Sequence, residues 1–393
     1  MSEDGPALSA ASAKASRWRS EPFRIFFPLG VIFAWIGVGH WLAYATGLTA
    51  SYSCKFHGLV QMQAFMMAFA VGFLLTALPR RTQAPVASSD ELIAFVAALV
   101  LTMAGAIMER WVVSELAYAA IFVLLAQFAL RRFMAGSANR RPPAAFVLLP
   151  IAALQALAGA ILIAMAEFPN TPPSSASLGR LLVEQGVFLC LAVGIGGLVL
   201  PLIGGAPPPA DLGSSPRETR KAIAYGLAGI TIFASLVLEQ AGCDRGGPLL
   251  RAIVVALGLG LGAGAWRQPG KPGVHRKFVW LAAWMMPTGL AVSALWPDYR
   301  VPALHILFIG GFSLMAFGVA THVALGHLGM EKFALGRPIA VIVLGASFLI
   351  AMAIRVGADA SDAYFGHLGW AAAIWIAGSA VWLIFLGPKM IRS

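Results

Sequence analysis

The sequence predicts an all-α polytopic membrane protein, a bundle of about twelve transmembrane helices with both termini in the cytoplasm. Of its 393 residues, 59% are hydrophobic and only 11% are charged, whereas soluble domains carry about 25% charged residues. The mean hydropathy is +0.80. Apolar runs follow one another too closely to leave room for a soluble domain of ~100 residues. We therefore expect residues 1–20 to form a polar cytoplasmic tail and residues 21–393 to form a single integral membrane domain.

Twelve apolar runs are long enough to cross a bilayer, when they are counted between charged or Pro/Gly-rich breaks. Their expected limits are 24–46, 56–79, 90–108, 111–130, 144–166, 179–203, 219–241, 248–266, 276–296, 302–328, 337–356 and 364–387. Only Glu109 and Arg110 separate the third run from the fourth. These two spans should therefore form a tight helical hairpin.

The distribution of basic residues predicts the orientation of the chain. With the N-terminus inside, only seven of the 28 Lys and Arg residues fall outside. These seven are Lys55, Arg110, Arg180, Arg245, Arg251, Arg300 and Arg355. An excess of positive charge on the cytoplasmic side is the usual rule for membrane proteins. The net charge of +11 therefore indicates topology and lipid contact, and nucleic acid is not an expected partner.

The seven histidines divide between the two halves of the membrane. On the predicted topology, the exterior half contains His40, His57, His305 and His367. The cytoplasmic half contains His275, His322 and His327. Ionisable side chains inside a membrane usually face the protein interior and mark functional sites. The histidines are therefore the first candidates for a site.

Helix geometry limits which histidines can share one metal. His305 and His327 lie in the same span, and a rise of 1.5 Å per residue separates them by roughly 33 Å. His322 and His327 are five residues apart, about 140° around the helix axis, so they do not form an i, i+4 chelating pair. The tenth span must therefore serve two places, or only one of its ends is functional.

Imidazole suits haem iron, copper and zinc, and thioether sulfur favours Cu(I). Histidines on different spans could hold a haem in the interior of a bundle. We predict an exterior-half site that joins His57 and His305, with His367 as a further ligand. His327 and His322 are the candidate ligands on the cytoplasmic side. His275 lies within the polar stretch KPGVHRK and is interpreted as a solvated loop residue.

Other polar groups leave alternatives open. Cys54 and Cys243 both fall in predicted exterior loops, where they could form a disulfide or remain two free thiols. Glu184 and Glu239 lie within spans and could bind protons or cations, or could pair with Arg180 and Arg245. His40 is interpreted as an interfacial residue beside Trp41.

Three stretches together resemble the NnrS family. They are PFRIFFPLG in the first span, HGLVQMQAFMMAFAVGFLLTALPR in the second, and PALHILFIGGFSLMAFGVATHVALGHLG in the tenth. The resemblance covers the twelve-span layout, and the tenth-span pattern is its most specific part. His57, His305 and His327 are the residues that match the motifs of the family. Many relatives begin the second span with His-x-His-Glu-Met, where this chain retains only His57.

The resemblance implies a multi-pass protein of the bacterial inner (cytoplasmic) membrane that takes part in the nitric oxide response and protects against nitrosative stress during denitrification. The implied cofactors are haem b and copper, and the implied small ligand is the neutral gas nitric oxide. Turnover of the gas and binding alone both remain open, and no catalytic acid–base pair is predicted. A secondary transporter of a small solute is the main alternative, and a redox subunit like that of haem–copper oxidases is a third.

Overall fold

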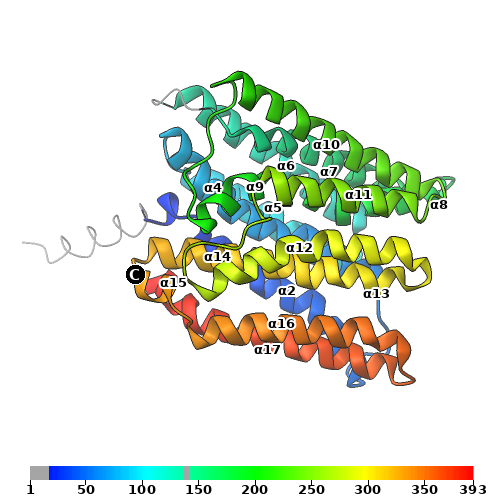
Figure 1. The fold of residues 1–393 in the computed structure, drawn as a ribbon. Coiled ribbons are helices and arrows are strands. Elements are labelled where there is room, and N and C mark those ends of the chain that lie inside the picture. Colours follow the sequence, from blue (N-terminus) through cyan, green and yellow to red (C-terminus); the bar gives the residue numbers. More distant parts are fainter. Residues whose placement is uncertain (1–16, 137–140, 393) are drawn as a thin grey trace, which may run out of the picture.

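The computed structural model describes residues 17–136 and 141–392, and within these ranges the chain forms helices and no strands. Most of the predicted tail, residues 1–16, lies outside the described part. Eleven of the described helices are long and apolar enough to cross a membrane. They pack side by side as one bundle (Figure 1). The prediction of an all-α polytopic membrane protein is therefore confirmed.

The helices coincide closely with the expected spans. In chain order they are α2 Phe23–Ala45, α3 Cys54–Val60, η1 Gln61–Met66, α4 Met67–Thr82, α5 Ser89–Ile107, α6 Trp111–Ala135, η2 Ala144–Val147, α7 Leu148–Met165, α8 Pro173–Leu181, η3 Leu182–Gly186, α9 Val187–Gly204, α10 Pro216–Gln240, α11 Gly246–Leu257, η4 Gly258–Gly262, α12 Val274–Leu295, η5 Pro297–Tyr299, α13 Arg300–His305, η6 Ile306–Ser313, α14 Leu314–His327, α15 Glu331–Leu335, α16 Ile339–Gly357, η7 Ala358–Ala360 and α17 Tyr364–Arg392.

The helix found at the eighth expected span is the shortest of the twelve described. It corresponds to α11 and η4, an apolar helix over Gly246–Gly262 that is shorter than the other eleven. This helix packs between α10 and α12 and runs antiparallel to both (Figure 1). The described N-terminal segment and the C-terminus lie at the same end of the bundle (Figure 1), as an even number of passes requires. We call this the termini end and the other the Cys54 end.

Local sequence signals begin several helices. The hydroxyl groups of Ser53, Ser88 and Ser215 accept hydrogen bonds from backbone N–H groups in the first turns of α3, α5 and α10. At α5 the Glu91 side chain also accepts from the Ser88 N–H, which completes a capping box. These caps satisfy N–H groups that have no partner within the helix.

The hairpin predicted at Glu109 and Arg110 is present. Glu109 has φ 54°, and the Arg110 N–H donates to the Gly105 carbonyl over 2.7 Å. A Cβ atom on Gly105 would lie 2.8 Å from the Ser114 backbone nitrogen. Only glycine therefore permits α5 and α6 to approach so closely after the turn.

Buried charges are paired across helices. Glu239 on α10 binds the fully buried Arg251 on α11 and also Arg300 on α13, which lies 2.5 Å away. The sequence suggested Arg245 as its partner, and this was wrong because Arg251 lies within the helix that packs on α10. Glu184 does pair with Arg180, over 2.9 Å. Paired carboxylates of this kind can stay charged in an apolar interior.

The core around α14 is aromatic. Phe317 is fully buried and lies within 6.0 Å, between ring centroids, of Phe65, Phe69, Trp375 and Trp382. Aromatic pairs at these separations add favourable energy to the burial of their surface. This cluster holds α4, α14 and α17 together in the middle of the bundle.

The three cysteines are unbonded, so the structure has two free thiols where a Cys54–Cys243 disulfide was the alternative. Cys54 and Cys243 are exposed, and Cys190 is buried. Cys54 begins α3, and Cys243 lies in the connection from α10 to α11, both at the Cys54 end, opposite the termini.

This arrangement gives a direct test of the predicted orientation. A membrane-impermeant maleimide added to spheroplasts should label Cys54 and Cys243 and spare Cys190. The Cys54→Ser, Cys243→Ser double variant should not be labelled. Labelling of the two thiols only in inside-out vesicles would show that the termini face the exterior.

Candidate functional site

A cavity of about 260 Å³ at the Cys54 end brings together His57 and His305. Its wall comes from α2, α3, η1, α8, η3, α13, η6, α16 and α17. Aromatic rings form much of the apolar wall, namely Trp41, Phe65, Phe308 and Trp375. We call this space the histidine cavity. The predicted meeting of the second and tenth spans at this depth is therefore present.

In both histidines Nδ1 faces a backbone carbonyl oxygen, from another helix at His57 and from the same helix at His305. Nδ1 of His57 lies 2.9 Å from the Gly37 carbonyl oxygen on α2, and Nδ1 of His305 lies 2.8 Å from that of Val301. A carbonyl oxygen can only accept, so each Nδ1 carries the proton in the neutral ring. The Nε2 lone pairs have no hydrogen bond in the described structure. Metal-binding histidines usually have this arrangement, with the second nitrogen donating to a carbonyl or carboxylate.

Three of the cavity-lining segments are π-helical. The η1 segment begins four residues after His57, η6 begins directly after His305, and η3 includes Glu184. Within η6 the Ser313 hydroxyl donates to the carbonyl of Phe308, five residues earlier, over 3.0 Å. A π-helical turn holds an additional residue and is frequent at functional sites. The widened turns change the faces on which the following side chains lie without leaving backbone groups unpaired.

Three arginines line the same cavity, each from a different helix. Arg180 pairs with Glu184, Arg300 pairs with Glu239, and Arg355 lies 3.3 Å from a carboxylate oxygen of Asp359. Glu239 already neutralises Arg251, so the cavity wall has an excess of positive charge. Such a wall favours an anionic or carboxylate-bearing ligand.

Sulfur atoms also line the histidine cavity. Cys54 precedes His57 by three residues, and Met62 and Met66 follow it on η1. Thioether and thiolate sulfur are ligands that Cu(I) prefers. Among the described residues, no cluster of three or more His, Cys, Asp or Glu side chains is placed to hold a metal ion. A copper ion here would therefore need methionine sulfur beside His57.

Two further histidines lie at the Cys54 end but do not line the cavity. Nδ1 of His367 donates to the Ala363 carbonyl over 3.0 Å, and its neighbour Leu368 lines the cavity in its place. Nε2 of His40 accepts the Ser53 N–H over 2.7 Å, so this nitrogen is occupied. The structure therefore does not bring His367 together with His57 and His305.

His327 lies at the termini end, as its distance from His305 predicted. Its Nδ1 lies 3.2 Å from a carboxylate oxygen of Glu21, and its Nε2 lies 2.6 Å from the Arg80 guanidinium. Phe23 packs edge-on against its ring, with 4.9 Å between the centroids. Nε2 therefore has a polar partner, and Nδ1 lies within ion-pair distance of Glu21 without a hydrogen bond. These contacts link α14 to α4 and to the segment before α2.

The interpretation of His275 as a solvated loop residue was wrong. His275 is fully buried in the first turn of α12, and its Nε2 lies 3.2 Å from Nδ1 of His322 on α14. The two rings stack with 5.4 Å between their centroids. A glycine at position 273 with φ 130° starts α12 earlier than the polar sequence suggested. The pair links α12 to α14 and has no third ligand among the described residues.

A model of the family described as NnrS protein matches residues 17–393, essentially the whole chain. A comparison with curated proteins gave no match.

Glu115 is a buried acid that was not among the residues predicted from the sequence. Glu115 on α6 is fully buried, and its Oε2 accepts a hydrogen bond from Nε2 of Gln63 on η1 over 2.7 Å. Its Oε1 and the hydroxyl of the nearby Tyr118 are buried without a partner. No arginine or lysine forms an ion pair with Glu115 in the described part of the chain. The available signal was a single acid in the interior of the expected span 111–130.

We expect substitutions of Glu115 to separate packing from charge. Glu115→Ala removes the acceptor of the Gln63 amide and should lower stability by about 1–3 kcal/mol, the usual cost of an unpaired buried group. Glu115→Gln keeps an acceptor of the same shape and should retain the wild-type melting temperature or exceed it. Thermal unfolding in mild detergent measures both. Equal destabilisation by the two substitutions would show that the charge itself is required.

Proposed function

Because this chain belongs to the NnrS family, we propose that it is a haem-binding protein of the bacterial inner membrane that binds nitric oxide in defence against nitrosative stress. The observation that carries the proposal is the pair His57 and His305. The two side chains come from separate spans and line one cavity, and each has a free Nε2. Copper is the second proposed cofactor.

The donor groups of the histidine cavity fit haem b. Haem iron takes imidazole nitrogen as an axial ligand, and His57 and His305 would hold it. The macrocycle is flat and apolar, which suits the aromatic side chains of Trp41, Phe65 and Trp375. Its two carboxylate groups would pair with the arginines of the cavity wall. The site therefore has a matching group for each part of the cofactor.

Protein residues prepare the two imidazoles for this role. The Gly37 and Val301 carbonyls hold the proton on Nδ1, which keeps Nε2 as a lone-pair donor. Haem iron, when bound, would supply a centre for a small neutral gas, which would take the place of one of the two imidazoles. The proposal concerns binding of the gas, and we assign no catalytic residue.

Copper has partial support from the same wall. In protein without haem, Nε2 of His57 would offer imidazole nitrogen, and Met62 and Met66 would offer thioether sulfur within the next three turns of helix. The pair His275 and His322 is a weaker candidate because it offers two nitrogens that already contact each other.

The two alternatives have less support. Transporter sites are often built from discontinuous helices with unwound backbone at mid-membrane. The described helices that line this cavity continue through their π-helical turns without unwinding. A redox subunit like that of haem–copper oxidases would need a second, histidine-rich metal site, and the described residues contain no cluster of three such ligands.

The proposal predicts a pigment that depends on two histidines. Protein expressed with adequate haem and purified in mild detergent should have a Soret band and stoichiometric iron. His57→Ala and His305→Ala should each reduce the haem content at least several-fold, because each removes an axial nitrogen. Optical spectra, iron analysis and nitric oxide difference spectra measure these effects.

His367→Ala, at the same end as the cavity, and His327→Ala, at the termini end, are the matched controls, since neither residue lines the cavity wall. Both should retain the Soret band. Haem that survives both cavity substitutions, or wild-type protein without pigment, would overturn the proposed function.

A further inference from the structure

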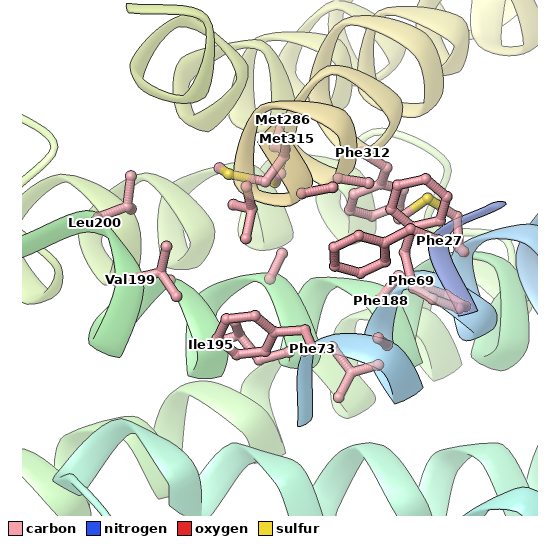
Figure 2. Close-up of a pocket in the computed structure, with 18 residues that line it drawn as sticks. Phe27, Phe69, Phe73, Phe188, Ile195, Val199, Leu200, Met286, Phe312 and Met315 are labelled. Atoms are coloured by element: carbon pink, nitrogen blue, oxygen red, sulfur yellow. The ribbon is translucent and has the colours of Figure 1, made fainter. Parts of the chain in front are cut away.

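A second cavity lies beside the histidine cavity, nearer the middle of the bundle. Its volume is about 90 Å³, and its wall consists of apolar atoms alone. Figure 2 shows the side chains of α4 and α9, among them Phe73 and Ile195, across the space from Met286, Phe312 and Met315. We call this space the apolar cavity.

The wall of the apolar cavity offers a water molecule no hydrogen-bond partner. A buried water molecule needs two to four polar partners, and this wall offers none. A void without atoms, on the other hand, deprives its lining of dispersion contacts, which larger side chains would restore. Small residues persist on both sides of the space, at Ala70, Ala192, Gly196, Ala316 and Ala320. Small side chains on both sides therefore leave an apolar space between α4, α9 and α14.

None of the lining residues is exposed. Eleven are fully buried and seven are half-buried, so the space is partly open on one side. The helices α4 and α9 belong to the spans Cys54–Thr82 and Pro173–Gly204. In each of these spans 78% of the most apolar stretch is buried inside the protein, a larger part than in the other long described spans. A space of about 90 Å³ suits a small compact molecule better than a length of lipid acyl chain.

The two cavities share one wall residue, Met66 at the end of η1. Next to Met66, two pairs of aromatic rings also separate the two cavities. Phe65 and Phe308 line the histidine cavity, and their partners Phe69 and Phe312 line the apolar cavity at centroid distances of 5.3 and 6.1 Å. Methionine is unbranched and flexible, so Met66 can change rotamer more easily than the rings beside it. A small ligand would therefore pass between the two cavities most easily at Met66.

We propose that the apolar cavity is a binding site for a small neutral apolar gas, and that Met66 separates this gas site from the histidine cavity. The identification of the gas with nitric oxide rests on the proposed function. The gas site itself rests only on the geometry of the cavity. Dry apolar cavities in other proteins bind xenon and benzene, which shows that such spaces can take up neutral ligands from solution.

Xenon is the probe for the test, because it is apolar, compact and visible by anomalous scattering. Crystals of the full chain pressurised with xenon should show a peak inside the apolar cavity. Ala316→Leu on α14 and Ala192→Leu on α9 fill the space from opposite sides, and each should abolish the peak. Neither residue lines the histidine cavity. Ala97→Leu, at an exposed position on α5, makes the same chemical change and should leave the peak unaltered.

The variant His57→Ala separates this inference from the proposed function. Xenon should still bind in that variant, and also in protein without pigment, so the gas site can hold even if haem binding fails. Absence of xenon from the wild type would overturn the inference. Persistence of the peak in both leucine variants would also overturn it, as would an acyl or detergent chain that fills the cavity.

Discussion

Inside a bilayer, every backbone N–H and C=O group must find its partner within the protein, and the architecture follows from this constraint. All the described spans are helices, because a helix satisfies its own backbone. The π-helical turns η1, η3 and η6 obey the same rule, since each accommodates an additional residue while keeping the hydrogen bonds internal. Irregularity is thus introduced at the histidine cavity without exposing unpaired polar groups to lipid.

Buried polar side chains meet the same requirement in three different ways. Glu239 is paired with two arginines, so its charge is neutralised where it lies. His327 contacts Arg80 through Nε2 and lies within ion-pair distance of Glu21 at the termini end, which makes it a structural link between helices. His57 and His305 each donate from one nitrogen and keep the other free. Among these histidines, His57 and His305 are distinguished by lining one cavity with Nε2 unpaired in the described structure.

The two neighbouring cavities differ in the chemistry of their walls. The histidine cavity combines imidazole, guanidinium and sulfur groups, whereas the adjacent space has an apolar wall alone. A neutral gas distributes favourably into an apolar environment, and a charged solute does not. Placing the apolar space behind Met66 keeps the polar chemistry and the apolar storage in separate compartments of one bundle. Both depend on the same two helices, which continue through η1 and η6.

The sequence by itself determined the helical class and the span limits, because hydrophobic length and the bilayer thickness are linked without regard to tertiary contacts. It also determined that His305 and His327 serve different places, since helical rise fixes their separation. Which faces of the helices meet was decided only by packing. Helix rotation brought His57 to His305, left His367 outside the cavity, and buried His275 and Glu115 against partners far away in the chain. Hydropathy contains no information on such rotations, so these contacts required the tertiary structure.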